Sequence, residues 1–339
     1  MDISKVPLMT VCIVVLNREW IIAEMLKSLI GQSYPHNRIY IVVVDGGSKD
    51  RTVDIVRKTL DNSDFKGYEI ISQVCNIPEG RNICIKKMLG DMLFFWDSDV
   101  LMEKDALQRF VGTALREKVD IVSAKATYVS VNSADEIDSK LNRFLSQKQD
   151  SVLIEALFVG MGHTLISRKV FESVLFDPDL TFSEDQYFSV LARKRNFKMV
   201  VDLGVRVFDI NIMREVYSDI YVNMPLTSSL RGLRKKAKSH VLSYTLKPTI
   251  KGVISYFLKY KRYIIYLGYL PAACLTFLGL FGNIYLLMVF PMYFFVFAFL
   301  QVVKRGINQG LRSVLKSMMV GIPFSLLLVY YFIVYAMKD

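Results

Sequence analysis

The stretch from residue 39 to residue 60 reads IYIVVVDGGSKDRTVDIVRKTL. Its first part, Ile39–Val44, is a short apolar run rich in β-branched residues, which predicts a buried strand. The glycines of Asp45-Gly46-Gly47-Ser48 predict a turn, and the apolar spacing from about Asp50 to Leu60 predicts a helix. A buried strand that leads into a helix through a short turn is the repeating unit of an α/β fold.

The same alternation surrounds this unit. The pattern predicts strands at Leu8–Val15, Tyr68–Ser72 and Met92–Trp96, and helices at Glu19–Ile30 and from Pro78 to about Leu89. Apolar strands interleaved with helices form a mainly parallel sheet that helices cover on both faces. We therefore expect residues 1–225 to form one Rossmann-like α/β domain.

Polar residues stand where these predicted strands end: Asn17, Asp45, Asp97 and Asp99. In such sheets ligands bind beyond the carboxyl ends of the strands, so the side chains predict a binding site. Asp97-Ser98-Asp99 directly follows its strand without a basic neighbour, and such paired carboxylates favour Mg²⁺ or Mn²⁺. The alternative is a pair of solvated turn residues, as expected for Asp177-Pro178-Asp179 in a proline-containing loop.

Three other positions allow a functional and a structural interpretation. The Asp45 carboxylate either accepts N–H hydrogen bonds from a nucleobase, with the glycines admitting a close approach, or belongs to a flexible turn. Arg81-Asn82, in the helix after Pro78, is either a cation brought to a nucleotide or a surface pair. His163 lies between apolar residues, which is more typical of a packed or hydrogen-bonded histidine than of a catalytic one.

The composition favours a membrane protein. Of the 339 residues 52% are hydrophobic, and the mean hydropathy of +0.31 is high for a soluble protein. The net charge of +11 is uneven, because the chain from Leu226 onward has 15 Lys and Arg and one acidic residue. Since this cationic part adjoins long apolar segments, we expect a membrane and no nucleic acid as partner.

Three apolar segments have the length of a membrane span. Residues 263–303 contain no charge, about twice the ~20 residues that one crossing needs, and Gly282-Asn283 provides a turn signal between two helices. We expect transmembrane helices at about 263–281, 284–303 and 317–337. Lysines and arginines fill the loop at 304–316, so the positive-inside rule predicts a multi-pass protein of the cell membrane with a cytoplasmic N-terminal domain.

Residues 226–262 connect the domain to the spans. Ten Lys and Arg and no carboxylate lie between residues 231 and 262, among apolar residues at helical spacing. This pattern predicts basic amphipathic helices in the headgroup layer of the membrane. Such helices either anchor the domain only or also hold the phosphate of a lipid substrate.

The four cysteines, Cys12, Cys75, Cys84 and Cys274, follow neither a zinc pattern nor a disulfide framework. We therefore expect reduced thiols and a reducing compartment for the polar domain. The three histidines are too far apart in the sequence to predict a zinc site.

Several motifs occur together in a fixed order: Val14-Val15-Leu16-Asn17-Arg18, residues 44–52, Glu79-Gly80-Arg81-Asn82, Asp97-Ser98-Asp99, residues 158–168 and Ser183-Glu184-Asp185-Gln186. In order and approximate spacing they resemble glycosyltransferase family 2 with its GT-A fold. The resemblance covers roughly 200 residues. It implies an inverting, metal-dependent transfer of a sugar from a nucleotide-sugar donor. The Gln-x-x-Arg-Trp motif of processive members is absent, so we do not expect polymer synthesis.

The resemblance also implies roles for particular residues. The residues expected to bind the nucleotide sugar are Asn17, Glu19, Asp45, Arg81, Asp97 and Ser98. Asp99, with Asp97, would hold Mn²⁺ or Mg²⁺ on the diphosphate, and Asp209 stands where some relatives place a metal-ligating histidine. Asp185 would be the general base, Glu184 would shape the acceptor site, and His163 lies near the acceptor strand.

Two functions from different classes follow. The first is a membrane-anchored glycosyltransferase that uses a UDP- or GDP-linked sugar and a lipid-linked acceptor, either a polyprenyl or dolichyl phosphate or a hydroxyl of a lipid-linked saccharide. A lipid phosphate is mostly ionised at pH 7 and needs no base, whereas a hydroxyl needs the base that Glu184-Asp185 supplies. The alternative is a non-catalytic membrane scaffold or lipid carrier with a degenerate GT-A domain.

Overall fold

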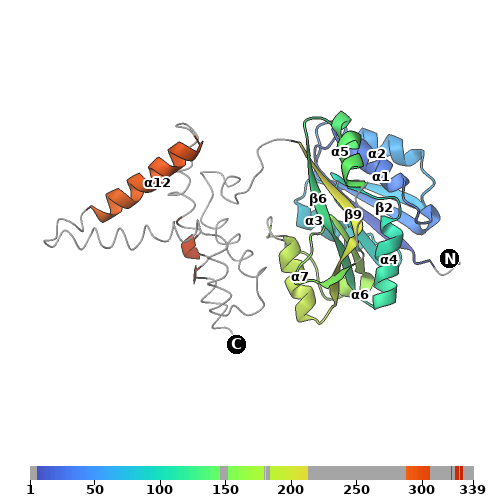
Figure 1. Cartoon of the computed structure of the whole chain (residues 1–339). Helices are drawn as coiled ribbons and strands as arrows, with labels where there is room; N and C mark the ends of the chain where they lie inside the picture. Colours follow the sequence, from blue (N-terminus) through green and yellow to red (C-terminus); the bar gives the residue numbers. More distant parts are fainter. Residues whose placement is uncertain are drawn as a thin grey trace. The chain divides into compact units, whose positions relative to one another are not determined.

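The fold is taken from a computed structural model (Figure 1). It describes residues 6–145, 152–178, 180, 184–212 and 288–305, with short pieces at 322, 325–327 and 329–330. The chain divides into two compact units, Met1–Glu215 and Val216–Asp339, and each is described by itself. The expected boundary near residue 225 lies outside the described residues and stays a prediction.

Nine strands of the described residues form one mixed sheet. From edge to edge the order is β3 (Gly67–Ser72), β2 (Ile39–Asp45), β1 (Met9–Val15), β4 (Met92–Trp96), β8 (His163–Ser167), β6 (Ile121–Val131), β9 (Met199–Ile212) and β5 (Val100–Met102), while β7 (Leu153–Glu155) also pairs with β9. β1 to β4 are parallel. β8 is antiparallel to β4 and β6, and β5 and β7 are antiparallel to β9.

The prediction of a mainly parallel sheet is thus right for the first half of the domain and wrong for the second. In β1 to β4 the helical crossovers return each strand in the same direction, as the local sequence indicates. In the second half only β6 and β9 are parallel neighbours. The direction of a short strand such as β8 depends on its connections, and its own residues do not encode it.

Helices cover both faces of the sheet, as predicted (Figure 1). One face carries α1 (Ile22–Ile30), α2 (Thr52–Asp61), α4 (Ala106–Glu117) and α5 (Ile137–Leu145). The other face carries α3 (Ile77–Lys86), α6 (Arg168–Phe171) and α7 (Glu184–Lys194). Two short 3₁₀ turns, η2 (His36–Arg38) and η3 (Ala134–Glu136), complete the described elements of this unit.

The alternation of side chains along each central strand explains the two layers of helices. In β4, Phe94 and Trp96 point into the core under α1 and α4, whereas Leu93 and Phe95 point into the core under α3 and α7. Successive side chains of a strand face opposite sides of the sheet. A strand that is apolar at every position must therefore be covered on both faces, which is why these strands read as continuous hydrophobic runs.

The predicted elements of residues 8–96 are confirmed, with shifts at two helix ends. α1 begins at Ile22 and not at Glu19, because residues 17–19 are used in hydrogen bonds to the loop after β2. α3 ends at Lys86 and not near Leu89, ahead of Gly90, whose φ of +77° turns the chain into β4. Glycine adopts this conformation without steric cost.

The prediction of reduced cysteines is wrong for one pair. A disulfide joins Cys12 of β1 to Cys84 of α3, with Cα atoms 5.8 Å apart. The partners are 72 residues apart in the sequence and become neighbours only because α3 packs on β1. Spacing along the chain therefore carries no signal for this bond. Cys75 is a free thiol, and Cys274 lies outside the described residues.

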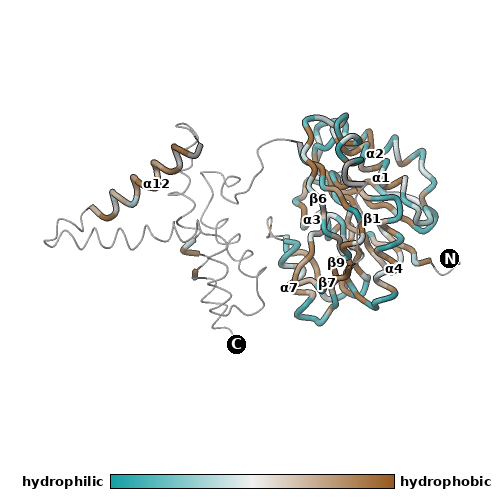
Figure 2. Tube along the Cα trace, viewed as in Figure 1, coloured by the Kyte–Doolittle hydropathy of each residue, from teal (hydrophilic) through white to brown (hydrophobic). Residues whose placement is uncertain are grey.

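The second unit is described mainly through α12 (Val289–Arg305), which overlaps the expected span at 284–303. Large apolar side chains are exposed along it at helical spacing: Met292, Phe295, Val296, Phe299, Leu300 and Val303. Hydrophobic colours predominate along α12 in Figure 2. Within the described parts of the chain, every helix falls short of the length and apolarity that a bilayer crossing requires. The amphipathic segment at 226–262 and the spans at 263–281 and 317–337 lie largely outside the described residues and stay predictions.

Candidate active site

The turn Asp97-Ser98-Asp99 lies between β4 and β5, at the carboxyl end of β4. The Trp96 indole N–H donates to the Val100 carbonyl at 2.8 Å, and the Val100 N–H donates to the Asp97 carbonyl at 3.1 Å. The Asp97 N–H donates to the Gly162 carbonyl, and the Asp99 carbonyl accepts from the Ile210 N–H, both at 2.9 Å. The backbone of both carboxylate-bearing residues is thus fixed to later parts of the chain, Asp97 to the residue before β8 and Asp99 to β9.

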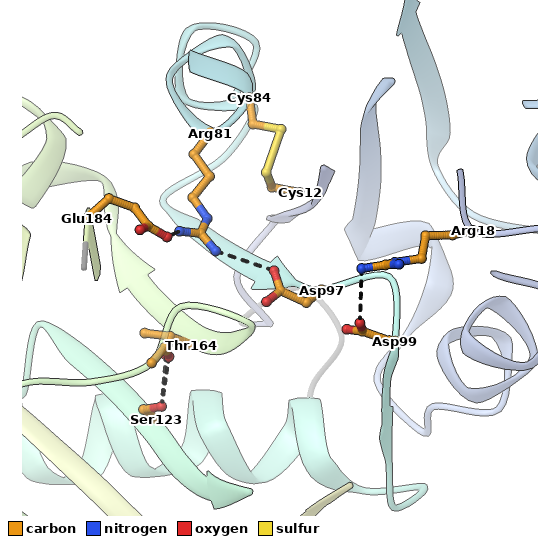
Figure 3. A network of polar contacts seen from close by, with 10 residues as sticks. Cys12, Arg18, Arg81, Cys84, Asp97, Asp99, Ser123, Thr164 and Glu184 are labelled. Atoms are coloured by element: carbon orange, nitrogen blue, oxygen red, sulfur yellow. Dashed lines mark hydrogen bonds and ion pairs between the residues drawn. A yellow bond between two sulfur atoms is a disulfide. The ribbon is translucent and has the colours of Figure 1, made fainter. Parts of the chain in front are cut away.

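Arg81 brings two distant acidic residues together (Figure 3). Its Nη1 lies 2.8 Å from Glu184 Oε1, and its Nη2 lies 3.4 Å from Asp97 Oδ1. The Arg81 and Glu184 side chains are 5% and 14% exposed, so their contact is shielded from water, whereas the Asp97 side chain is 43% exposed. The structure therefore brings together three predicted site residues from α3, the turn after β4 and the first turn of α7.

The position of Arg81 follows from the start of α3. Asn76 and Glu79 form a capping box, in which Asn76 Oδ1 accepts from the Glu79 N–H and Glu79 Oε2 accepts from the Asn76 N–H. This arrangement fixes the first turn of the helix by providing acceptors for two N–H groups that have no partner within the helix. Arg81 follows directly after that turn and points inward, with its guanidinium carbon 5.8 Å from the ring centre of Phe95 and 5.4 Å from that of Phe176.

Asn82 explains why Phe176 lies against Arg81. Its Oδ1 accepts from the Phe176 N–H at 3.0 Å, and its Nδ2 donates to the Phe176 carbonyl at 2.8 Å. This pair of bonds ties the segment before α7 to α3. From the sequence, Arg81-Asn82 is either a nucleotide contact or a surface pair. In the structure Arg81 is buried in the site, and Asn82 positions its neighbours.

Asp99 faces Arg18, a residue that belongs to one of the sequence motifs but was not predicted to lie in the site. Arg18 Nη2 lies 3.6 Å from Asp99 Oδ2 (Figure 3). Burial and the nearby Asp97 and Asp209 carboxylates raise the pKa of Asp99 to about 7, against the opposing effect of Arg18. The signal for Arg18 is visible in the sequence, since it directly follows Asn17 at the end of β1.

Asp97, Asp99 and Asp209 offer carboxylate oxygens, which are the type of ligand that a hard divalent cation prefers. Burial raises the pKa of Asp209, and the negative charge of Asp97 raises it further. Asp209 Oδ1 accepts a hydrogen bond from Asn211 Nδ2 at 2.7 Å. Carboxylates that repel one another in this way are stabilised by a cation. Among the described residues, however, no three His, Cys, Asp or Glu side chains are arranged to enclose a metal ion.

The arrangement suits an ion with few protein ligands. Mg²⁺ is commonly held by one or two carboxylates together with substrate phosphates and water. Asp99 and Asp97 provide such carboxylates at the end of β4. The expected ligand role of Asp209 stays a prediction.

Asp185 lies in the first turn of α7, beside Glu184. Its Oδ1 accepts from the Gln186 N–H at 2.7 Å. Burial, then the Glu184 charge, raises the pKa of Asp185 to about 6, and Arg81 opposes the rise. A carboxylate with a pKa close to the working pH is suited to general-base catalysis, because it is ionised and yet accepts a proton. The predicted roles of Asp185 and Glu184 are compatible with this geometry.

Asp45 is turned into its own loop. It is 3% exposed, and its oxygens accept from the Gly47 N–H at 3.2 Å and the Ser48 N–H at 3.1 Å. Gly47 has a φ of +100°, which glycine adopts without strain. The structure thus bears out the turn role of Asp45, and the contact to a nucleobase stays a prediction.

Asn17 and Glu19 join the loop after β1 to the loop after β2. Asn17 Oδ1 accepts from the Lys49 N–H at 2.8 Å, and Glu19 Oε2 accepts from the Arg51 N–H at 3.0 Å. Asn17 has a φ of 51°, a left-handed conformation that asparagine tolerates better than most residues. Both side chains hold two strand-end loops together, whatever further contacts they make to a nucleotide.

His163 begins β8 and is hydrogen-bonded to the backbone. Its Nε2 lies 3.0 Å from the Ala124 carbonyl, so this nitrogen carries the proton. Burial lowers the pKa of His163, against the opposing effect of Asp97. The expectation of a hydrogen-bonded histidine is confirmed, and a role in acceptor binding stays a prediction.

Tyr128 is a further residue that the sequence did not single out. It lies on β6 opposite Asp209 of β9, and it is 75% exposed. Partial burial of the hydroxyl end of this side chain, followed by the negative charges of Asp209 and Asp185, raises the pKa of the Tyr128 hydroxyl. An exposed aromatic side chain thus lies within electrostatic reach of the candidate base.

Gly162 provides a specific test of the Asp97 position. A Cβ at residue 162 would lie 2.4 Å from Asp97 Oδ2, so Gly162→Ala must displace the carboxylate. We expect this variant to weaken Mn²⁺-dependent nucleotide binding about tenfold, as for the loss of one charge-assisted contact. Calorimetric titration with UDP and GDP measures the effect.

Gly160→Ala is the matched control, because its added Cβ would only come within 3.8 Å of the His163 ring. Equal affinities of the two variants would contradict the assignment of Asp97 to the nucleotide site.

Two solved structures share this α/β fold. The mannosyltransferase PcManGT of Pyrobaculum calidifontis, in complex with GDP-Man and Mn²⁺, has a TM-score of 0.51 at 15% identity over 98% of this chain and 86% of its own. GalNAc-T7 with UDP, GalNAc and Mn²⁺ has a TM-score of 0.52 at 16% identity, over 69% and 48%. These comparisons establish the GT-A class of fold.

The sequence comparison then gives the family. Residues 10–175 match Glycosyl transferase family 2, and the chain therefore carries a domain of that family. The resemblance inferred from the motifs is confirmed.

Curated relatives are similar over part of their length. The poly(ribitol-phosphate) β-N-acetylglucosaminyltransferase TarS of Staphylococcus aureus is 25% identical over 183 residues, which is 52% of this chain and 30% of TarS. Glycosyltransferase AglE of Haloferax volcanii is 30% identical over 142 residues, or 41% and 47%. A Methanococcus voltae glucuronosyltransferase, named for a dolichyl N-acetylglucosaminyl phosphate, is 24% identical over 207 residues, or 56% and 62%. The match thus spans less than two thirds of each relative.

Proposed function

We propose that this protein is a membrane-anchored, inverting glycosyltransferase that moves a sugar from a UDP- or GDP-linked donor to a lipid-linked acceptor at the cytoplasmic face of the cell membrane. The observation that carries the proposal is the position of Arg81. The Arg81 guanidinium contacts two carboxylates. One belongs to Asp97 in the candidate donor site, and the other to Glu184, the neighbour of the candidate base. The family of the domain supports the same activity.

The residues have distinct tasks in the proposed reaction. Asp99 and Asp97 would hold Mn²⁺ or Mg²⁺, which when bound offsets negative charge on the departing nucleoside diphosphate. The acceptor oxygen forms a bond to the anomeric carbon while the bond to the diphosphate breaks. Asp185 takes the proton of the acceptor hydroxyl, which suits its raised pKa. Arg81 keeps Asp97 and Glu184 in place on either side.

The lipid-linked acceptor and the membrane rest on the C-terminal part of the sequence. The uncharged segments and the ten cations at 231–262 support an anchor in an anionic leaflet. The exposed apolar side chains of α12 are compatible with contact to lipid. The Methanococcus voltae relative is named for a dolichyl-linked phosphate, which supports the acceptor class.

The test is a transfer assay with the full chain in isolated membranes. UDP- and GDP-linked sugars are supplied one at a time with Mn²⁺, and the extracted lipids are analysed by mass spectrometry. We expect one donor to add the mass of its sugar to a lipid, EDTA to abolish the addition, and added Mn²⁺ to restore it. A protein that resists carbonate extraction, yet neither binds nor turns over any donor, would support the scaffold interpretation instead.

A further inference from the structure

Arg18 has a fixed backbone and a loosely held side chain. Its N–H donates to Thr52 Oγ1 at 2.8 Å, and its carbonyl accepts from the N–H groups of Ile21 and Ile22 at 3.0 and 2.9 Å. These bonds set the residue at the junction of the loops after β1 and β2, ahead of α1. The guanidinium has the Asp99 contact of 3.6 Å, with the Arg18 side chain 40% exposed.

The ion pair between Arg18 and Asp99 is weak, so another partner of the guanidinium can replace it. Ion pairs of this exposure contribute only about 0–1 kcal/mol, because water competes for both partners. Asp99 is one residue from Asp97, and its carbonyl accepts from the N–H of Ile210, the neighbour of Asp209, so three acidic residues gather here and attract a positive charge. In this structure the Arg18 guanidinium supplies that positive charge (Figure 3).

A guanidinium also binds phosphate oxygens through two parallel N–H bonds, which is stronger than the 3.6 Å contact of Arg18 with the Asp99 carboxylate. A nucleoside diphosphate bound at the strand ends would place such oxygens close to Asp99, where the divalent ion is expected. Arg18 therefore has two possible partners within the same small region, one of them present only when the donor is bound.

We propose that Arg18 is a positioning residue that pairs with Asp99 in the free enzyme and moves to the diphosphate when the donor and the divalent ion bind. This inference rests on the proposed nucleotide-sugar site. Because the guanidinium competes with the ion for Asp99, the free enzyme binds the ion weakly. The diphosphate removes this competitor, so the nucleotide and the ion bind cooperatively, and the coupling is reciprocal.

The test measures binding without any acceptor, in the purified full chain. Mn²⁺ affinity is measured by electron paramagnetic resonance with and without UDP or GDP, for the natural protein and Arg18→Gln. We expect Arg18→Gln to bind Mn²⁺ alone about two- to fivefold more tightly, since the competing ion pair is lost. We expect its affinity for the diphosphate to fall about tenfold or more, since a charge-assisted contact is lost. The cooperativity between Mn²⁺ and nucleotide then shrinks.

Arg116→Gln is the matched control, because Arg116 lies in the last turn of α4, is paired with Glu117 and has a 62% exposed side chain. Its Mn²⁺ and nucleotide affinities are expected to equal those of the natural protein. Unchanged affinities in Arg18→Gln, or weaker binding of Mn²⁺ alone, would overturn the role of Arg18 while leaving the proposed function intact. A natural protein that binds neither Mn²⁺ nor a nucleotide would overturn both.

Discussion

Asp185→Asn is expected to reduce sugar transfer to a hydroxyl acceptor by about 10²- to 10⁴-fold, the usual cost of losing a general base. The amide has nearly the shape of the carboxylate and keeps the Oδ1 that accepts from the Gln186 N–H. Donor binding should therefore be unchanged, which calorimetry with UDP and GDP would measure. Near-normal turnover in this variant, with intact Mn²⁺ binding, would exclude a hydroxyl acceptor and favour a lipid phosphate.

The same variant has a pH signature. Because the pKa of Asp185 is about 6, the fraction in the base form rises as the pH increases through that value. The turnover of the natural protein should therefore rise between pH 5 and 7, within about a unit of this pKa. Asp185→Asn should lack this rise, and its residual rate should be flat over the same range. A natural rate independent of pH would argue against Asp185 as the base.

Stability provides an independent check with the opposite sign. The folded-state pKa of Asp185 lies above the ordinary value of 3.8, so the buried charge destabilises the fold at pH 7, and protonation below about pH 6 relieves the cost. Removing the charge should raise the free energy of unfolding by about 2–3 kcal/mol at pH 7.5. The gain should disappear near pH 4. Urea unfolding at the two pH values measures it, and a variant less stable at pH 7.5 would contradict the raised pKa.

The first half of the domain is predictable from the sequence because its signals are local. The strands β1, β2 and β4 are apolar runs bounded by turn residues, and the helices that follow β1 and β2 have their own apolar spacing. The polar residues at the strand ends are visible for the same reason. Asp97 and Asp99 therefore stand out as a pair in the sequence alone, and the fold places both at one edge of the sheet.

The partners of those residues are not predictable in this way, because they depend on contacts between distant segments. Arg81 is buried only because Phe95 and Phe176 enclose it, and Phe176 is held there by Asn82 from another element. The disulfide between Cys12 and Cys84 likewise depends on the packing of α3 against β1. Neither the burial of an arginine nor the pairing of two thiols is encoded in the residues next to them.

Arg81→Ala is expected to lower transfer by about 10²- to 10³-fold, as observed when one preorganised electrostatic contact is removed from an active site. The truncation leaves Glu184, which is 14% exposed, without its guanidinium partner at 2.8 Å. Breaking a buried ion pair in this way should reduce the free energy of unfolding by about 3–5 kcal/mol. Donor affinity should fall as well, because Asp97 loses the same partner.

The pH profile separates a catalytic effect of Arg81 from a loss of stability. Arg81 lowers the pKa of Asp185, so in Arg81→Ala the rise of turnover with pH should move to higher pH. Arg81→Lys keeps the charge and should largely restore the natural pH dependence, but a single ammonium lacks the planar fork that contacts Glu184 and Asp97 together, so its rate stays reduced.

Arg109→Ala, which breaks the pair with Glu103 at 3.0 Å, is the matched control. It should lower stability without moving the pH dependence, and a shift as large as that of Arg81→Ala would show that Arg81 has no special link to the base.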